Sequence, residues 1–129
     1  MKIKLTSIYV DDQDKALAFY TDTLGLVKKA DFTQGPFRWL TVASAEDPNG
    51  TELQLAKSDN PAGKAYQQAL FAQGQPALML FSDDIKADVN LIERKGGTMK
   101  MKPTDVTAST IAQIVDGVGN IVQITQLKW

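Results

Sequence analysis

The sequence predicts an α+β fold built from two copies of one unit, in which a strand and a helix are followed by three more strands. Two observations indicate the repeat. A pair of aspartates begins an amphipathic helical stretch twice, at Asp11-Asp12 and at Asp83-Asp84. A glycine ends each stretch, at Gly25 and at Gly97, which are 72 residues apart (97 − 25). Because helices commonly end at glycine, the two segments represent the same helix in two equivalent units.

The helix of the first unit is predicted from the spacing of its apolar residues. Leu17, Tyr20 and Leu24 fall at positions i, i+3 and i+7, which lie on one helix face. Asp11 or Asp12 can cap this helix by accepting hydrogen bonds from free backbone N–H groups. Apolar or alternating runs bounded by turn residues predict the strands. The first unit is therefore expected to contain strand 3–10, helix 12–24 and strands 26–33, 36–43 and 51–56.

A second helix is expected to connect the two units over residues 60–73. Asn60 is a suitable cap, and Pro61 fits the first helical position because its missing N–H is not needed there. Gly74 is expected to end the helix. Tyr66 and Leu70 share one helix face, and we expect them to cover apolar surface.

The second unit repeats the order of the first, with strand 76–81, helix 84–95 and strands 98–102, 107–115 and 120–127. Pro103 is expected to end the strand that precedes it, because proline cannot donate a ladder hydrogen bond. The last two strands are expected to turn at residues 116–119. Gly119 in this turn corresponds to Gly50 of the first unit, 69 residues earlier (119 − 50).

The composition limits the classes of function. With 129 residues, of which 43% are hydrophobic and 22% charged, the chain fits one domain with a sizeable core. A net charge of −1 and dispersed basic residues argue against nucleic acid or anionic membranes as partners. The N-terminal stretch lacks an apolar signal segment, and the longest apolar run, 77–81, is too short to cross a membrane. We therefore expect a soluble, cytoplasmic protein.

The chain contains no cysteine and no histidine. The lack of cysteine excludes disulfides, thiolate catalysis and sulfur-ligated metals. The lack of histidine removes the side chain most used for proton transfer near neutral pH and the commonest transition-metal ligand. Chemistry that depends on either residue is excluded.

The repeated segments resemble the vicinal oxygen chelate superfamily, which includes glyoxalase I, extradiol dioxygenases, fosfomycin-resistance transferases and bleomycin-resistance proteins. The resemblance covers nearly the whole chain and is carried by 10–12, 16–20, 24–26, 83–84 and 96–97. It implies one domain, 1–129, with two βαβββ modules at about 1–57 and 75–129, joined by the connector helix 60–73. The resemblance further implies that their curled mixed sheets surround a shared cavity, often in a dimer. A homodimer is therefore expected.

In metal-using members of this superfamily, the ligands lie on the first and last strand of each module and are typically His and Glu. The resemblance places these positions at Leu5, Ala77, Gln54 and Gln123, none of which is a good ligand. Glu52 is the nearest carboxylate and shares a strand face with Gln54. Because one carboxylate does not repay the dehydration of a divalent ion, we expect no metal site and no cofactor.

What remains is a cavity with polar and aromatic side chains. Glu52, Gln54 and Gln123 are expected to point into it as hydrogen-bond partners, in preference to the alternative of a solvated strand face. Trp39 could stack on a planar ligand, or it could belong to the core or to a dimer interface. Ser7 could donate a hydrogen bond, and Met79 is suited to fill an irregular gap. The expected ligand-binding residues are Ser7, Trp39, Glu52, Gln54, Met79 and Gln123.

Three functions are consistent with these features. The first is a protein that binds or sequesters a small apolar or aromatic molecule without transforming it, as the resemblance to bleomycin-resistance proteins implies. The second is a lyase, dioxygenase or transferase of the superfamily in which Glu52, the single catalytic candidate, acts as a base or metal ligand. The third is a non-catalytic interaction module that uses the fold as a scaffold. We expect the first rather than an enzyme.

Overall fold

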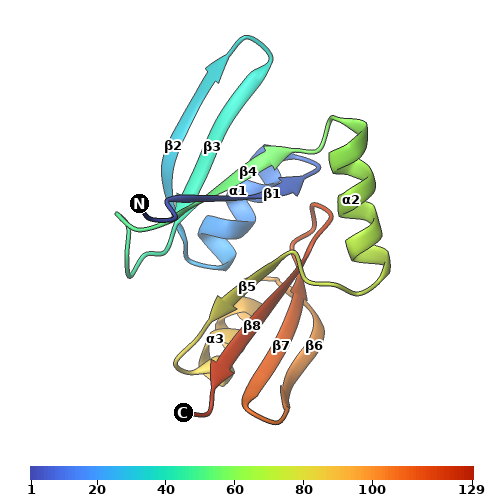
Figure 1. Cartoon of the computed structure of the whole chain (residues 1–129). Coiled ribbons are helices and arrows are strands. Elements are labelled where there is room, and N and C mark those ends of the chain that lie inside the picture. The colour runs from blue at the N-terminus through green and yellow to red at the C-terminus, as the bar shows by residue number, and fades with distance from the viewer.

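The computed structural model covers residues 1–129 and contains two four-stranded mixed sheets, which confirms the expected α+β class (Figure 1). The first sheet has the order β1-β4-β3-β2, and the second has the order β5-β8-β7-β6. In each sheet the first and last strands of the unit pair in parallel, and the other pairs are antiparallel. The first sheet consists of β1 (Leu5–Val10), β2 (Val27–Gln34), β3 (Phe37–Ala43) and β4 (Glu52–Lys57), and the second of β5 (Leu78–Phe81), β6 (Thr98–Asp105), β7 (Ser109–Val115) and β8 (Ile121–Leu127).

The two βαβββ units are equivalent in strand register. Ser7 of β1 lies opposite Gln54 of β4, and Met79 of β5 lies opposite Gln123 of β8. Since 79 − 7 = 72 and 123 − 54 = 69, the two offsets found in the sequence describe the same pair of positions in each sheet. We refer to β1–β4 with their helix as module 1, and to β5–β8 with theirs as module 2.

The predicted helix caps are present. Helix α1 (Gln13–Ala18) is capped by Asp12, whose carboxylate accepts a hydrogen bond from the Lys15 amide at 3.0 Å. The connector helix α2 (Pro61–Ala72) begins at Asn60, which accepts from the Gly63 amide at 2.6 Å. Helix α3 (Ile85–Arg94) is capped by Asp84. In the first helix, where either aspartate could cap, the structure selects Asp12.

The first helix ends differently from its counterpart. After Ala18 it continues as a wider π-helical turn, η1 (Phe19–Thr23), which contains a hydrogen bond from the Leu24 amide to the Phe19 carbonyl. The glycines with positive φ that follow these two helices, the first helix and α3, are Gly25 and Gly96, which are 71 residues apart. The expected match of Gly25 with Gly97 is therefore wrong by one residue, because a π turn inserts one extra residue into a helix.

One face of each sheet packs against its helix, and Figure 1 shows α1 behind the first sheet and α3 behind the second. In module 1, Leu40, Val42, Leu53 and Leu55 form a buried cluster with residues of β1, α1 and η1. In module 2, Ile114 and its neighbours pack against the apolar side of α3. The opposite face of the second sheet carries no helix, and that of the first meets α2 at Tyr9 of β1; we call these two faces the open faces.

The second strand of the second unit is longer than expected. β6 extends to Asp105 and thus passes through Pro103, which the sequence analysis placed at its end. The pairing of β6 with β7 shifts register between Met99 and Met101 and again between Met101 and Thr104. Because β6 lies at the edge of the sheet and is bulged there, a residue without an N–H donor is accommodated.

The connector helix docks through the face that carries Gly63, Gln67 and the half-buried Leu70, so the expectation for Leu70 agrees with the structure and that for Tyr66 does not. Gly63 and Gln67 are its buried residues, whereas the side chain of Tyr66 is 61% exposed. A Cβ at Gly63 would lie 2.7 Å from the Tyr9 ring, so glycine is required for this close approach. Gln67 donates hydrogen bonds to the carbonyls of Tyr9 and Val118. The connector therefore docks through polar contacts rather than through Tyr66.

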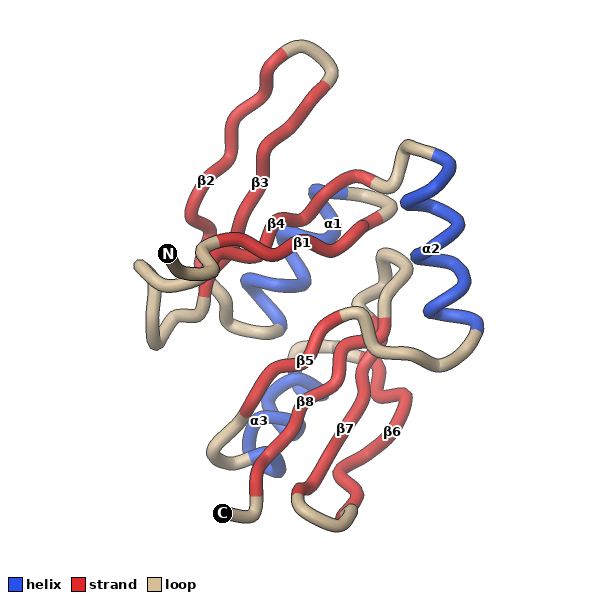
Figure 2. Tube along the Cα trace, in the orientation of Figure 1, coloured by secondary structure: helices blue, strands red, loops and turns tan.

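The turn between β7 and β8, residues 116–120, joins the two modules. The buried Asp116 carboxylate accepts hydrogen bonds from the Tyr20 hydroxyl of module 1 (2.6 Å) and from the Val118 and Asn120 amides. Asn120 in turn donates to the Tyr9 carbonyl at 2.7 Å, and Val118 is buried in the module 1 core. Figure 2 shows this turn reaching from the second sheet toward β1 and α2. The turn is therefore part of the core.

No helix of the structure has both the length and the apolar character needed to span a membrane.

The Tyr20 hydroxyl generates a prediction about stability. Replacing Tyr20 by phenylalanine removes one of the hydrogen bonds that the buried Asp116 carboxylate accepts, so we expect the free energy of unfolding to fall by about 2 kcal/mol. Urea denaturation at neutral pH measures the loss. The Tyr66→Phe variant is the matched control, because Tyr66 is exposed and its hydroxyl makes no hydrogen bond within the chain. Equal stability of the Tyr20→Phe variant and the parent would contradict the assignment.

The same hydroxyl predicts a pH dependence. Burial, reinforced by the charge and hydrogen bond of Asp116, raises the pKa of Tyr20 well above its usual value. Above about pH 10 the unfolded chain releases this proton whereas the native chain keeps it, so native stability falls as the pH rises. The expected slope from this group is about 1.4 kcal/mol per pH unit. The Tyr20→Phe variant should lack this contribution, and parallel curves for the two proteins between pH 9 and 11 would refute the prediction.

Candidate functional site

The open face of module 1 brings several of the predicted residues together. Residues on this face alternate with the buried residues that pack on α1, so Ser7, Gln54 and Thr41 lie across three neighbouring strands. Ser7 Oγ donates a hydrogen bond to Oε1 of Gln54 at 2.8 Å. Thr41 is fully buried and donates to Oε1 of Glu52 at 2.6 Å. The second carboxylate oxygen of Glu52 accepts no hydrogen bond from the chain.

The open face of module 2 carries an equivalent polar row. Gln113 of β7 lies opposite Gln123 of β8, and its amide donates to Oε1 of Gln123 at 3.1 Å. The amide of Gln123 donates in turn to the Thr125 hydroxyl at 3.3 Å. Gln113 and Thr125 are buried. Gln123 is thus held in one orientation by partners on both sides.

Aromatic side chains border the polar row of module 1. Trp39 and Phe37 lie on the same face of β3, with their ring centroids 6.3 Å apart. Phe32 of β2 is the register partner of Trp39 and is more than half exposed. Figure 1 shows the β2–β3 hairpin, which carries these rings, projecting beyond the rest of the molecule.

Arg38 lies on the opposite face from Trp39, as the strand alternation requires. Its guanidinium donates to Asp31 at 2.9 Å and to Asp14 of α1 at 2.7 Å. The hydrogen bonds and charge of Arg38 hold the pKa of Asp31 below its usual value. Arg38 therefore fixes the hairpin to α1 and does not belong to the open face.

The predicted residues of module 2 differ in their surroundings. Met79 is 47% exposed, so it fills no gap within the chain, contrary to the expectation that it acts as a filler. Its neighbour along the face, Phe81, is exposed as well. Apolar side chains of both modules thus remain uncovered on the open faces.

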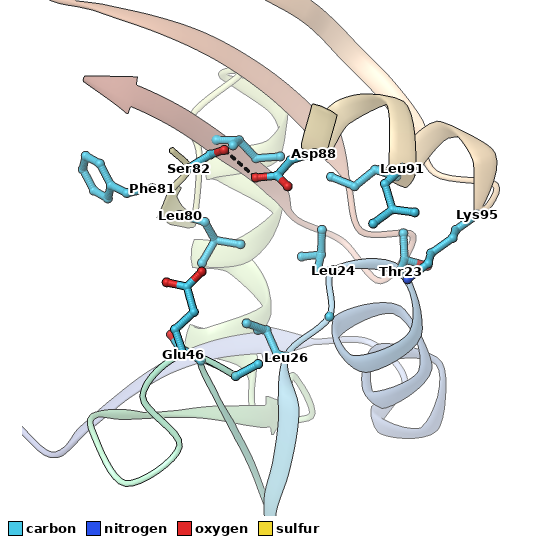
Figure 3. A pocket seen from close by; sticks show the side chains of 15 residues that line it. Thr23, Leu24, Leu26, Glu46, Leu80, Phe81, Ser82, Asp88, Leu91 and Lys95 are labelled. Atoms are coloured by element: carbon cyan, nitrogen blue, oxygen red, sulfur yellow. Dashed lines mark hydrogen bonds between the residues drawn. The ribbon is translucent and has the colours of Figure 1, made fainter. Parts of the chain in front are cut away.

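Five of the six predicted ligand-binding residues line none of the three main hollows of the chain. The first, of about 260 Å³, lies between the modules beside α3 (Figure 3). The second, of about 590 Å³, lies beside α2, and the third, of about 80 Å³, includes Ser7 and Ala77. None of these three hollows is lined by Trp39, Glu52 or Gln123. The shared cavity that the resemblance implies therefore stays a prediction.

The side chains at the four metal-ligand positions that the resemblance implies do not fit a divalent ion. Two of the four are apolar, Leu5 and Ala77, and the two glutamines are hydrogen-bonded to neighbouring side chains. No group of three or more acidic, histidine or cysteine residues is close enough to hold a metal ion. Glu52 is the single carboxylate of the open-face row. The donor set thus offers one charged ligand.

Three polar residues of the open faces were missed by the sequence analysis, namely Thr41, Gln113 and Thr125. Each follows or precedes a buried apolar residue in a strand with an apolar neighbourhood. The turn 116–120 joins β7 and β8 into a hairpin, and pairing the two strands around it places Gln113 directly opposite Gln123. This pair could therefore have been found from the sequence. Their burial could not be predicted from alternation alone.

Comparison with known proteins places this geometry in a family. Residues 2–124 match the model of the Glyoxalase/Bleomycin resistance protein/Dioxygenase superfamily. The chain belongs to this superfamily. The resemblance inferred from the repeated helix segments is confirmed, as is the mixed α+β architecture of two modules.

Relatives within the superfamily have different descriptions. The uncharacterized protein YurT of Bacillus subtilis (strain 168) is 47% identical over 126 residues, covering 98% of this chain and 99% of YurT. A probable lactoylglutathione lyase of Vibrio cholerae is 27% identical over 135 residues, covering 98% of this chain and 91% of that protein. The crystal structure of TnmS3, an antibiotic-binding protein from Streptomyces sp. CB03234, has a TM-score of 0.79 at 27% identity, covering 99% and 97% of the two chains. The relatives of this chain thus include a protein described as antibiotic-binding and another described as a probable lyase.

Proposed function

We propose that this protein binds a small apolar or aromatic molecule on its open faces, without a metal ion and without transforming it. The observation that carries the proposal is that Gln54 and Gln123, at equivalent positions of the two sheets, are each held by a side chain of a neighbouring strand, Ser7 and Gln113 respectively. Polar side chains held in fixed orientations among apolar surfaces are the usual means by which a binding site orients an apolar ligand. The similarity to TnmS3, described as antibiotic-binding, supports the same class of function.

The aromatic rings supply the expected binding energy. Trp39 and Phe37 offer two adjacent ring faces, and a planar ligand that covers them loses contact with water while it gains stacking contacts. The free oxygen of Glu52 and the amide groups of Gln54 and Gln123 then serve as hydrogen-bond partners for the polar edge of the ligand. Ser7 orients Gln54 in this arrangement, and Met79 contributes adaptable apolar surface.

We infer that a second copy of the chain covers the open faces. Phe32, Phe37 and Phe81 are each more than half exposed, and Met79 nearly so. Such a set of large apolar side chains is unusual on the surface of a monomer and is typical of an interface or a ligand site. A partner copy would enclose the polar rows and form the shared cavity that the single chain lacks.

A superfamily enzyme is the second candidate, and the Glu52 carboxylate favours it. One of its oxygens accepts from Thr41 and the other is free, so Glu52 is positioned as a base toward a bound molecule. The relative described as a probable lactoylglutathione lyase supports this class. Conversion of a bound compound by the parent, and not by the Glu52→Gln variant, would establish it.

The binding proposal predicts saturable, metal-independent binding of a planar aromatic probe. We expect 2-naphthol, titrated by isothermal calorimetry, to bind with the same affinity with and without EDTA. Replacing Gln123 by leucine removes a hydrogen-bond partner and should weaken binding about fivefold, as loss of about 1 kcal/mol implies. Gln68→Leu, on the exposed side of α2, is the matched control and should bind like the parent. Binding that depends on added Zn²⁺, Ni²⁺, Mn²⁺ or Fe²⁺ would contradict the proposal.

The dimer generates its own prediction. Charges introduced at exposed apolar positions of an interface oppose association without unfolding the monomer. The double variant Phe32→Glu/Phe37→Glu should therefore be monomeric by native mass spectrometry, whereas the parent should be a dimer. Tyr66→Glu, equally exposed on α2, should leave the dimer intact. A monomeric parent would refute the dimer and would leave the titration above as the test of binding by a single chain.

A further inference from the structure

The cavity beside α3 is built by both modules and includes one residue of the open faces, Phe81. Its volume is about 260 Å³. Leu24 and Leu26 follow the first helix, Leu80 belongs to β5, and Leu91 belongs to α3 (Figure 3). The loop between β3 and β4 supplies its remaining wall. None of the six predicted ligand-binding residues lines it, so it is distinct from the site proposed above.

The internal repeat explains why a hollow exists here. In module 1 the equivalent place is filled by Val118 of the β7–β8 turn, which is 2% exposed. Val118 shares a buried cluster with residues from β1, α1 and η1: Ile8, Val10, Ala16 and Tyr20. The equivalent residues of module 2 lie 72 positions later in the sequence, and all four line the cavity: Leu80, Ser82, Asp88 and Ile92. The cavity is therefore the counterpart of a place that is plugged in module 1.

The loop that would supply the second plug is too long to insert. The β7–β8 connection runs from 116 to 120, whereas the β3–β4 connection runs from 44 to 51 and is three residues longer. Asn49, which is 69 residues before Val118, is exposed, as are most residues of its loop. Ser44, Ala45 and Glu46 pass along the rim of the cavity without filling it. The extra length thus leaves the hollow open.

The lining of this hollow differs chemically from its plugged counterpart. Val10 and Ala16 of module 1 are replaced by Ser82 and Asp88, and the Ser82 hydroxyl donates a hydrogen bond to the Asp88 carboxylate. Figure 3 shows Glu46 and Asp88 on either side of Leu80, with Lys95 at the other end of the hollow. With two carboxylates and one ammonium group, the formal charge of the lining is −1. An apolar floor thus carries carboxylates at one end.

We propose that this hollow is a second binding site, which takes a small molecule with an apolar body and one cationic amine. The leucines and Ile92 contact the apolar body in the place that Val118 occupies in module 1. The amine pairs with Asp88 and Glu46, and it lies away from Lys95, which repels it. A carboxylate-bearing molecule is disfavoured at this end by the same two groups.

The experiment uses the full chain labelled with ¹⁵N and three probes of similar shape: 2-phenylethylammonium, 2-phenylethanol and 3-phenylpropanoate. We expect 2-phenylethylammonium to shift the amide signals of Gly25, Ser82 and Leu91 with a Kd on the order of 1 mM, typical of a fragment of this size. The alcohol and the carboxylate should bind at least fivefold more weakly, as one lost charge contact implies. Equal affinity for the carboxylate would overturn the proposal.

Two variants separate the hollow from other surfaces. Leu91→Trp fills it from an exposed position and should abolish the shifts, whereas Leu127→Trp, at a leucine of matching exposure on β8, should not. Asp88→Asn keeps a hydrogen-bond partner for Ser82 and should lower the affinity for 2-phenylethylammonium about fivefold. Asp83→Asn, outside the hollow, should leave the affinity unchanged. Amide shifts confined to residues of the open faces would overturn the proposal, and so would an unchanged affinity of Asp88→Asn for 2-phenylethylammonium. Neither result would contradict the open-face site proposed above.

Discussion

The buried Asp116 carboxylate is the interaction on which the arrangement of the two modules depends. A charged group removed from water is tolerated only when several donors surround it. Here a hydroxyl from module 1 and amides of its own turn supply them. Since the Tyr20 hydroxyl comes from one module and the amides from the other, the carboxylate is satisfied only when the modules are docked.

The same turn fixes the connector helix as well. The Val118 carbonyl accepts hydrogen bonds from the Asp11 amide and from the Gln67 side chain. Gln67 also donates to Tyr9, whose carbonyl accepts from Asn120. One short loop thus positions β1, α1 and α2. Ser7 lies on the first of these elements, β1. The position of the open-face row of module 1 is in this sense set by a residue of module 2.

Much of the fold could be predicted from the sequence, because helix caps, apolar spacing and turn glycines are local signals. Asp12, Asn60 and Asp84 all begin helices as expected. The extra residue of the π turn could not be predicted, since it leaves no mark except a one-residue difference between Gly25 and Gly96. The role of Asp116 was missed for a related reason: a turn signal predicts a change of direction and gives no information about what the turn contacts.

The candidate site was predictable only in part. Strand alternation placed Ser7, Gln54 and Gln123 on their faces, because the offset of the repeat fixes the register. The partners Thr41 and Gln113 depend on which strands pair across the sheet, and that is a tertiary property. Likewise the spacing of apolar residues in α2 placed Leu70 on the docking face, but it gives no sign of the close contact between Gly63 and the Tyr9 ring.

The three additional residues of the β3–β4 loop have a consequence for how such a chain diversifies. After a gene duplication, both halves begin with identical loops, and a small insertion in one loop changes its reach without altering either hydrogen-bonded sheet. Loop insertions of this kind cost little stability, because closure entropy grows slowly with length. A repeated scaffold can therefore acquire different recognition surfaces in its two halves through a difference in the length of one loop, while both sheets keep the same strand order.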